Sequence, residues 1–210
     1  MKSKYKDFKA FIFAGGKSSR MGFDKALINH PQGGNWLNHK IKILNDLNLE
    51  TYLLTNHNNH FEEIDSNSDV KVIFDNNPFE GPLHCMEQIF ATYNLNTKNV
   101  LIIPIDMPNL TTKIVSSFID YWGENKNYAL LSHDGNSVQP LFAIYPINEV
   151  NNSKLKERLN AGKKNFLGWV NLIPHKYFFA RNEEFININF KSELISVSYT
   201  HLRAHETSQH

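Results

Sequence analysis

Short apolar runs alternate with helical periodicities along most of this chain, and the alternation restricts the fold more than any other feature. Short runs predict strands at residues 10–14, 51–55, 71–74, 100–105, 128–131, 138–145 and 185–189. Apolar residues recur at helical spacing over residues 36–47, 82–93, 113–122, 150–159 and 165–170. Strands that alternate with helices form βαβ units. The sequence therefore predicts an α/β fold with a mainly parallel sheet.

The length of 210 residues suits one domain that can bury a substantial core. We expect that domain to occupy residues 1–196. Asn is frequent up to Asn189 and absent after it, and the following chain has no apolar period. Residues 197–210 are therefore expected to form a disordered or non-native tail, and a genuine frayed terminus is the alternative.

The charge and cysteine content exclude several classes of protein. Lys and Arg number 22 against 21 Asp and Glu, for a net charge of +1, so no basic footprint for nucleic acid is present. The single cysteine, Cys85, excludes a disulfide framework and a multi-cysteine metal site, and we expect it to be a small core residue. No apolar segment is long enough for a signal peptide or a membrane span, so a cytoplasmic location is expected.

A glycine-rich loop follows the first predicted strand. Residues 13–25 read Phe-Ala-Gly-Gly-Lys-Ser-Ser-Arg-Met-Gly-Phe-Asp-Lys. Glycines let successive backbone N–H groups approach an anion, and Arg20 and Lys25 can neutralise a polyphosphate. The position, at the carboxyl end of a strand, is where open α/β sheets bind ligands. A glycine-rich turn with a surface Arg and Lys is the other interpretation.

Two familiar phosphate-binding loops do not match this segment. A Walker A loop around Gly16-Lys17-Ser18 needs a glycine at position 11, where Phe11 stands. The G-x-G-x-x-G spacing of dinucleotide-binding proteins does not occur in the loop. The sequence therefore indicates a third kind of phosphate loop.

Two further predicted strands end in an aspartate. Asp106 follows residues 100–105, where a carboxylate is placed to hold Mg²⁺ against a triphosphate; capping of the next turn is the alternative. Asp75 follows residues 71–74 and can accept hydrogen bonds from a nucleoside, while Gly81 lets a base or ribose approach the backbone. An ordinary turn explains this second segment equally well. The glycine loop and both aspartates converge on one sheet edge, which predicts a nucleotide site.

The stretch from Ala14 to Leu27 resembles the signature of molybdenum cofactor guanylyltransferases. Segments 81–83, 105–108, 139–143, 161–162 and 185–189 follow in the order typical of that family, and the resemblance covers about residues 9–195. It implies a Rossmann-like three-layer sandwich of the nucleotidyltransferase type. It also implies transfer of GMP from GTP to molybdopterin-bound molybdenum cofactor, with release of pyrophosphate. Mg²⁺ is the implied cofactor, and cofactor-synthesis proteins and molybdoenzymes are the candidate partners.

The same resemblance assigns roles to individual positions. Lys25, Arg20 and Asp106 are the expected catalytic residues, and Asp106 is also the expected Mg²⁺ ligand. The expected nucleotide-binding set is Phe13, Ala14, Gly15, Gly16, Lys25, Asn56, Asp75, Gly81 and Asp106. Asn187 and Asn189 match a pair associated with the pterin side. The chain departs from the family after Asn189, where Phe-Lys-Ser-Glu replaces Thr-Pro-Glu, and this departure bears on the pterin side alone.

Two other functions stay open from the sequence. A transferase that uses CTP, on molybdopterin or on a small phosphorylated alcohol, shares the same loop chemistry. A non-catalytic nucleotide-binding or pterin-carrier module needs neither Lys25 nor Asp106. His133-Asp134 is interpreted as part of a hairpin turn because Gly135-Asn136 follows, and the three tryptophans are expected in the core.

Overall fold

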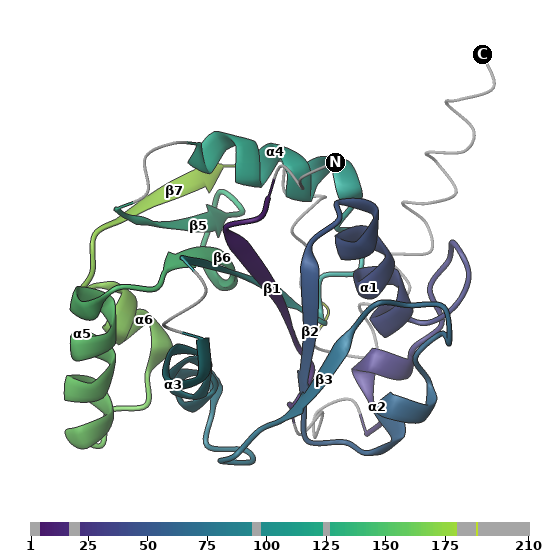
Figure 1. The fold of residues 1–210 in the computed structure, drawn as a ribbon, viewed down its shortest axis with the longest axis horizontal. Helices are drawn as coiled ribbons and strands as arrows, with labels where there is room; N and C mark the ends of the chain where they lie inside the picture. Colours follow the sequence, from purple (N-terminus) through teal and green to yellow (C-terminus); the bar gives the residue numbers. More distant parts are fainter. Residues whose placement is uncertain (1–4, 17–21, 94–97, 124–126, 180–187, 189–210) are drawn as a thin grey trace.

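The computed structural model describes residues 5–16, 22–93, 98–123, 127–179 and 188 (Figure 1). Its sheet has seven strands in the order β3-β2-β1-β4-β6-β5-β7. β6 runs antiparallel to both of its neighbours, and the other pairings are parallel, which confirms the mainly parallel sheet. The strands are β1 (Phe8–Phe13), β2 (Glu50–Thr55), β3 (Lys71–Phe74), β4 (Asn99–Pro104), β5 (Ala129–His133), β6 (Val138–Pro146) and β7 (His175–Phe179).

Helices cover both faces of the sheet and complete the expected three layers (Figure 1). α1 (Trp36–Asp46) and α4 (Thr112–Trp122) pack on one face, where they share one buried cluster with β1 and β4. The other face carries α3 (Pro82–Tyr93), α5 (Glu149–Asn160) and α6 (Phe166–Val170). Two short elements, the 3-10 helix η1 (Lys25–Leu27) and α2 (Asn59–Glu62), lie in the connections that follow β1 and β2.

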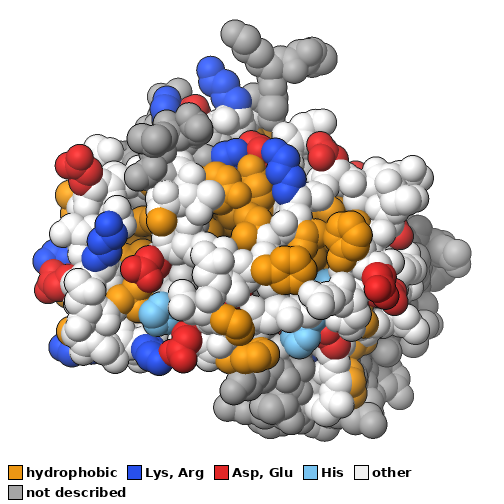
Figure 2. Space-filling view, turned by 60° about the horizontal axis from the view of Figure 1, so that its bottom comes forward, with side chains coloured by type: hydrophobic (Ala, Val, Ile, Leu, Met, Phe, Trp, Pro, Cys, Tyr) orange, Lys and Arg blue, Asp and Glu red, His pale blue; other side chains and the backbone are white. Residues whose placement is uncertain are grey.

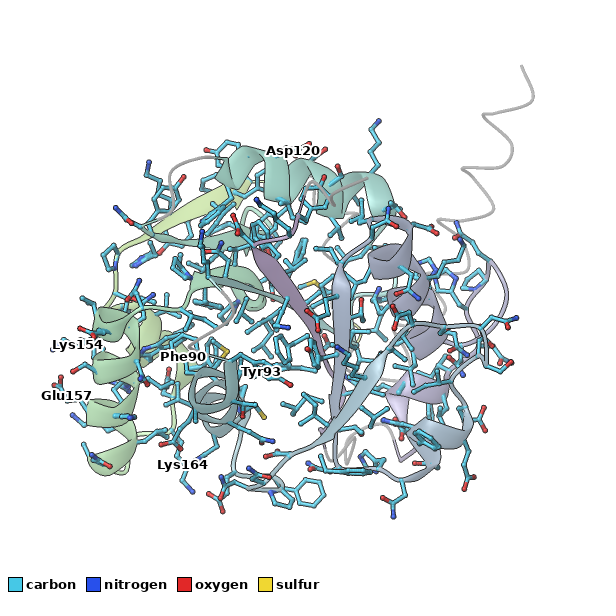
Figure 3. All side chains as sticks on the ribbon, in the orientation of Figure 1. Phe90, Tyr93, Asp120, Lys154, Glu157 and Lys164 are labelled. Carbon is cyan, nitrogen blue, oxygen red and sulfur yellow. The ribbon has the colours of Figure 1, made fainter. Side chains whose placement is uncertain are left out.

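Strand β1 shows how the alternation of side chains builds both cores. Ala10 and Ile12 point into the α1 and α4 side, whereas Phe11 points to the α3 side. The Phe11 ring lies 4.9 Å from Tyr52 and 5.5 Å from Tyr93, between ring centroids. Figure 3 shows Phe90 and Tyr93 projecting from α3 into the middle layer of the molecule. Residues of β1 are thus buried on both faces, as expected for a central strand of a parallel sheet.

Several local predictions are confirmed. Asp134 closes the turn between β5 and β6, where its carboxylate accepts from the backbone N–H groups of Asn136 and Ser137. Cys85 is buried, and so are Trp36, Trp122 and Trp169.

Other parts of the chain were not anticipated or cannot be compared. Strand β7, the short α2 and η1 were not expected from the apolar pattern. The predicted strand at residues 185–189 lies outside the described residues, apart from Ile188, and so does the tail at residues 197–210. Among the residues that the structure describes, no helix combines the length and the apolar character that crossing a bilayer requires.

Candidate functional site

The predicted nucleotide residues follow four adjacent parallel strands. Across the sheet, Asp75 follows β3, Asn56 follows β2, Gly15 lies just beyond β1 and Asp106 lies just beyond β4. These strands end at the same edge of the sheet, at the bottom of Figure 1. Figure 2 brings this side forward and shows hydrophobic side chains exposed among polar ones. The structure therefore brings the four predicted segments together along one edge.

The position of β1 marks the centre of this edge. The chain leaves β1 toward β2 on one side, while β4 pairs with β1 on the other, so the strand order reverses between β1 and β4. Open α/β sheets bind ligands in the crevice at such a reversal, outside the carboxyl ends of the strands. Gly15 and Asp106 follow the two strands, β1 and β4, between which the order reverses.

The first turn after β1 is fixed by contacts with the end of β2. The backbone N–H of Ala14 donates to the Leu54 carbonyl at 3.0 Å, and Asn56 Nδ2 donates to the Gly15 carbonyl at 3.0 Å. A Cβ atom on Gly15 would lie 3.0 Å from Asn56 Nδ2, so the close approach favours glycine. His57 Nε2 lies 3.3 Å from the Gly16 carbonyl. The structure thus places Asn56 against the loop.

The segment after β1 places Lys25, a predicted catalytic cation, close to Asp106, the predicted metal ligand. Lys25 Nζ lies 3.7 Å from Asp106 Oδ2, and 29% of the Asp106 side chain is exposed. Burial raises the pKa of Asp106 above its ordinary value, and the positive charge of Lys25 opposes that rise. Arg20, the other predicted catalytic cation, lies outside the described residues.

A buried hydrogen-bond chain holds the Lys25 turn against β2. Asp24 caps η1 by accepting from the Ala26 N–H at 3.0 Å, and its other oxygen accepts from His60 Nε2 at 2.7 Å. Thr55 Oγ1 lies 2.7 Å from His60 Nδ1. Because the Asp24 carboxylate only accepts, His60 carries its proton on Nε2 and accepts from Thr55 at Nδ1.

Partial burial acts to raise the pKa of Asp24, but the hydrogen bond from His60, followed by the one from the Ala26 N–H, holds that pKa below its ordinary value. His60 itself has no exposed surface. The sequence analysis assigned no role to it, although a histidine five residues beyond Thr55, at the end of a predicted strand, was a visible signal.

Asp75 lies at the far end of the edge and faces its own loop. One carboxylate oxygen accepts from the Asn77 N–H at 2.9 Å, and Cys85 Sγ lies 3.6 Å from the other. Burial and the negative charge of Asp75 raise the pKa of the Cys85 thiol to about 12. Gly81 has a φ of +101°, in the left-handed region that favours glycine. These contacts are those of the turn interpretation, and the nucleotide role of Asp75 and Gly81 stays a prediction.

The late segment of the chain reaches the same place. The backbone N–H of Ile188 donates to the Asp106 carbonyl at 2.9 Å, and the Ile188 side chain is buried against Trp36. Asn187 and Asn189, the predicted pterin-side pair, flank this residue in the sequence and lie outside the described residues.

Comparison with known proteins agrees with this geometry. The family model described as the MobA-like NTP transferase domain matches residues 10–168 of this chain. The chain belongs to this family.

Its relatives and structural neighbours carry related names. A probable molybdenum cofactor guanylyltransferase of Rhodopirellula baltica is 31% identical over 65% of this chain and 66% of its own length. A protein with the same name from Bacillus thuringiensis is 26% identical over 90% of this chain and 94% of its own length. The molybdopterin-guanine dinucleotide biosynthesis protein A of Archaeoglobus fulgidus has a similar structure, with a TM-score of 0.71 and 16% identity over 93% of this chain and 99% of its own. This MobA-like protein is accordingly a nucleotidyltransferase, and its likeness to the solved structure shows the shared fold.

Transferases of the MobA-like family typically need a divalent metal ion. In the described part of the chain, no three His, Cys, Asp or Glu side chains are grouped so as to hold one. Mg²⁺ is commonly bound by one or two carboxylates together with substrate phosphates. The partly exposed Asp106 carboxylate, just beyond the strand that pairs with β1, is compatible with such an ion.

Proposed function

We propose that this MobA-like transferase moves GMP from GTP to molybdopterin-bound molybdenum cofactor and releases pyrophosphate. The observation that carries the proposal is the pairing of Lys25 with Asp106, 3.7 Å apart, where the strand order reverses beside the glycine loop. The names of the relatives at 31% and 26% identity support the choice of GTP and molybdopterin as substrates.

In the proposed reaction, a terminal phosphate oxygen of molybdopterin attacks the α-phosphorus of GTP in line. A new phosphorus–oxygen bond forms, the bond between the α-phosphorus and the bridging oxygen breaks, and pyrophosphate leaves. The attacking phosphate is already an anion at neutral pH, so the protein needs no general base. The residues of the chain therefore act by positioning the reactants and by neutralising charge.

The glycine loop with Lys25 and the Asp106 carboxylate have distinct roles in the proposed reaction. The backbone N–H groups of Gly15 and Gly16 and the ammonium of Lys25 bind the triphosphate, and Arg20 adds a second cation. Asp106 would hold Mg²⁺, which when bound neutralises charge on the α-phosphate and the leaving pyrophosphate. Lys25 exchanges its contact with Asp106 for one with the phosphates. The chain of hydrogen bonds through Asp24 and His60 keeps the Lys25 turn in place.

The remaining predicted residues would complete the two substrate sites. Phe13, Ala14, Asn56, Asp75 and Gly81 are proposed to contact the nucleotide. Asn187 and Asn189 are proposed to contact the pterin side, and the hydrogen bond from Ile188 to the Asp106 carbonyl supports placing that segment next to the reaction.

Titration calorimetry of the full chain with Mg²⁺ and either GTP or CTP tests the proposal. We expect GTP to bind more tightly than CTP and Lys25→Ala to lose that binding. Lys42→Ala is the control, because Lys42 is exposed on the outer side of α1 and pairs with Asp46 at 3.0 Å. Preference for CTP would move the protein to the cytidylyl branch, and binding of neither nucleotide would contradict the proposed site.

Turnover separates an enzyme from a binding module. We expect pyrophosphate release when molybdopterin-bound cofactor is added to the GTP complex. Stoichiometric binding of GTP without pyrophosphate release under those conditions would instead identify a nucleotide-binding module that does not catalyse the transfer.

A further inference from the structure

The inner face of α1 contains a lysine where an apolar side chain would be expected. Lys40 has no exposed surface, and it lies on the buried side of α1 together with Leu37, Ile41 and Leu44. Burial lowers the pKa of Lys40 to about 7, while the negative charge of Asp106 acts in the opposite direction. A methionine of similar length would fill the same space without desolvating a charge. Packing alone therefore does not account for a lysine at this position.

The Lys40 ammonium is directed at the loop that carries the proposed metal ligand. Lys40 Nζ donates to the carbonyl of Met107, the residue directly after Asp106. Two histidines bind the same loop further along: His30 Nε2 lies 3.2 Å from the Pro108 carbonyl, and His39 Nε2 lies 3.0 Å from the Leu110 carbonyl.

These three side chains form a clamp on the loop after β4, which we call the carbonyl clamp (His30, His39 and Lys40). The rings of His30 and His39 stack with their centroids 3.7 Å apart, which fixes their relative position. His30 also accepts from the Gln32 N–H at 3.2 Å, so it is a neutral donor to Pro108. Lys40 is the member of the clamp that holds the carbonyl next to Asp106, and its ammonium and the Asp106 carboxylate favour each other's charged form.

Two lysines from different segments interact with Asp106. Lys25 Nζ lies 3.7 Å from Asp106 Oδ2, in the turn that the proposed function assigns to the triphosphate. Lys40 is completely buried and donates to the carbonyl of Met107, next to Asp106. When Lys25 moves to the phosphates, the hydrogen bond from Lys40 still holds the Asp106 turn.

We propose that Lys40 is a positioning residue for the metal-holding carboxylate. Its hydrogen bond fixes the Met107 carbonyl, and with it the turn that presents Asp106, also when Lys25 binds the nucleotide. The inference rests on the proposed function, because it takes Asp106 as the ligand of the metal that arrives with GTP.

Binding of Mn²⁺ in the presence of GTP tests this role without turnover. The bound ion is measured by electron paramagnetic resonance on the full chain, with wild type, Lys40→Met and Lys42→Met. Lys40→Met keeps an unbranched side chain of similar length and removes the ammonium that donates to the Met107 carbonyl, and Lys42→Met removes a lysine from the exposed side of the same helix. We expect Lys40→Met to weaken Mn²⁺ binding by roughly 10- to 100-fold, the range for residues that orient metal ligands, and Lys42→Met to leave it unchanged.

The thermal midpoint in metal-free buffer distinguishes positioning from a purely structural role. We expect Lys40→Met to unfold at the same temperature as wild type or higher, because the desolvated charge is gone. Weaker Mn²⁺ binding together with a lower thermal midpoint would overturn the proposal in favour of a structural role, and Mn²⁺ affinity within twofold of wild type would overturn it outright.

A second variant covers the case in which Lys40→Met does not fold. Lys40→Gln keeps an N–H donor for the Met107 carbonyl and removes the charge. We expect it to keep more of the Mn²⁺ affinity than is expected for Lys40→Met, and an affinity as low as that expected for Lys40→Met would overturn the role of the hydrogen bond to the Met107 carbonyl. If wild type itself binds no Mn²⁺ with GTP, the proposed function fails instead, so the two failures are distinguishable.

Discussion

Two aspartates that follow parallel strands at opposite ends of the candidate site have different surroundings. Asp106, after β4, lies 3.7 Å from Lys25 and keeps 29% of its side chain exposed. Asp75, after β3, is buried and accepts a hydrogen bond from the Asn77 N–H. In the sequence the two look alike, because each follows an apolar run and precedes a proline within three residues.

The difference lies in what packs against each carboxylate. The chain turns back on Asp75, so the backbone N–H of Asn77 and the thiol of Cys85 occupy its oxygens. At Asp106, the neighbours are cations from distant parts of the chain, Lys25 on the loop after β1 and Lys40 on α1. A carboxylate that pairs with Lys25 from another segment can exchange that contact for a metal ion when the lysine binds phosphates. A carboxylate such as Asp75, which accepts a hydrogen bond from its own turn, mainly stabilises that loop.

The largest expected effect is at the Asp106 end. Asp106→Ala should lower the rate of GMP transfer at least about a hundredfold, since the removal of a preorganised charge-stabilising group costs roughly 2.7–4 kcal/mol in other enzymes. Single-turnover kinetics with saturating GTP measures the change. Turnover near that of wild type would show that Asp106 does not have its proposed role and does not differ from Asp75 in function.

A variant of His60 tests whether the pairing of Lys25 with Asp106 depends on the buried hydrogen bonds through Asp24 and His60. In His60→Ala, Asp24 loses its 2.7 Å partner and Thr55 loses its acceptor. We expect the Kd for GTP to rise about tenfold, and unfolding to become easier by about 1–3 kcal/mol because buried polar groups are left unpaired. Calorimetry and denaturant unfolding measure the two changes. Thr55→Val retains the contact between Asp24 and His60 and should change both the Kd for GTP and the stability less than His60→Ala does. A larger effect of Thr55→Val would contradict the idea that His60 supports Asp24 directly.

Asp75→Ala should mainly affect stability. Loss of the hydrogen bonds from Asn77 and Cys85 is expected to lower the free energy of unfolding by about 1 kcal/mol. The rate should fall by less than at Asp106, within about tenfold, and denaturant unfolding beside the transfer assay gives both numbers. A loss of rate equal to that of Asp106→Ala, without a change in stability, would show that the two aspartates are equivalent in function.

The smallest expected effect concerns Cys85, which lies beside Asp75. Its titration changes the stability of the protein at high pH. Its pKa is raised from 9.0 to about 12, so the folded chain keeps the thiol proton over a range in which the unfolded chain loses it. The stabilising contribution is fully present below pH 9 and is lost as the pH rises toward 12, by at most about 1.4 kcal/mol per pH unit.

Comparison with Cys85→Ala isolates this contribution, since that variant lacks the thiol. The free energy of unfolding of wild type should fall more steeply than that of Cys85→Ala above pH 9. Alkylation of Cys85 by iodoacetamide at pH 8 should also be slow in the native state. Rapid alkylation without unfolding would show that the thiol is exposed and that the Asp75 end is open.

The sequence pattern was enough to predict an α/β fold and the edge at which the site lies. Short apolar runs predicted six of the seven strands, and parallel strands necessarily bring their carboxyl ends to one side. Strand β7 was missed because His175–Phe179 is not an aliphatic run, although its aromatic residues after Pro174 favour a strand. The glycine loop, Asp75 and Asp106 were therefore predicted on the same edge, and the family resemblance added Asn56 and the three layers.

Only the tertiary structure decided which of these residues face one another. Lys25 and Asp106 are far apart in the chain, and so are Asp24 and His60, and no local rule pairs them. The sequence did contain one trace of Lys40, a lysine three residues after Leu37 on the apolar face of a predicted helix. That face meets the loop after β4 only when α1 packs on the sheet. Local patterns fix periodicity and strand ends because those depend on neighbouring residues, whereas the pairing of charges depends on distances that exist only after the layers have packed.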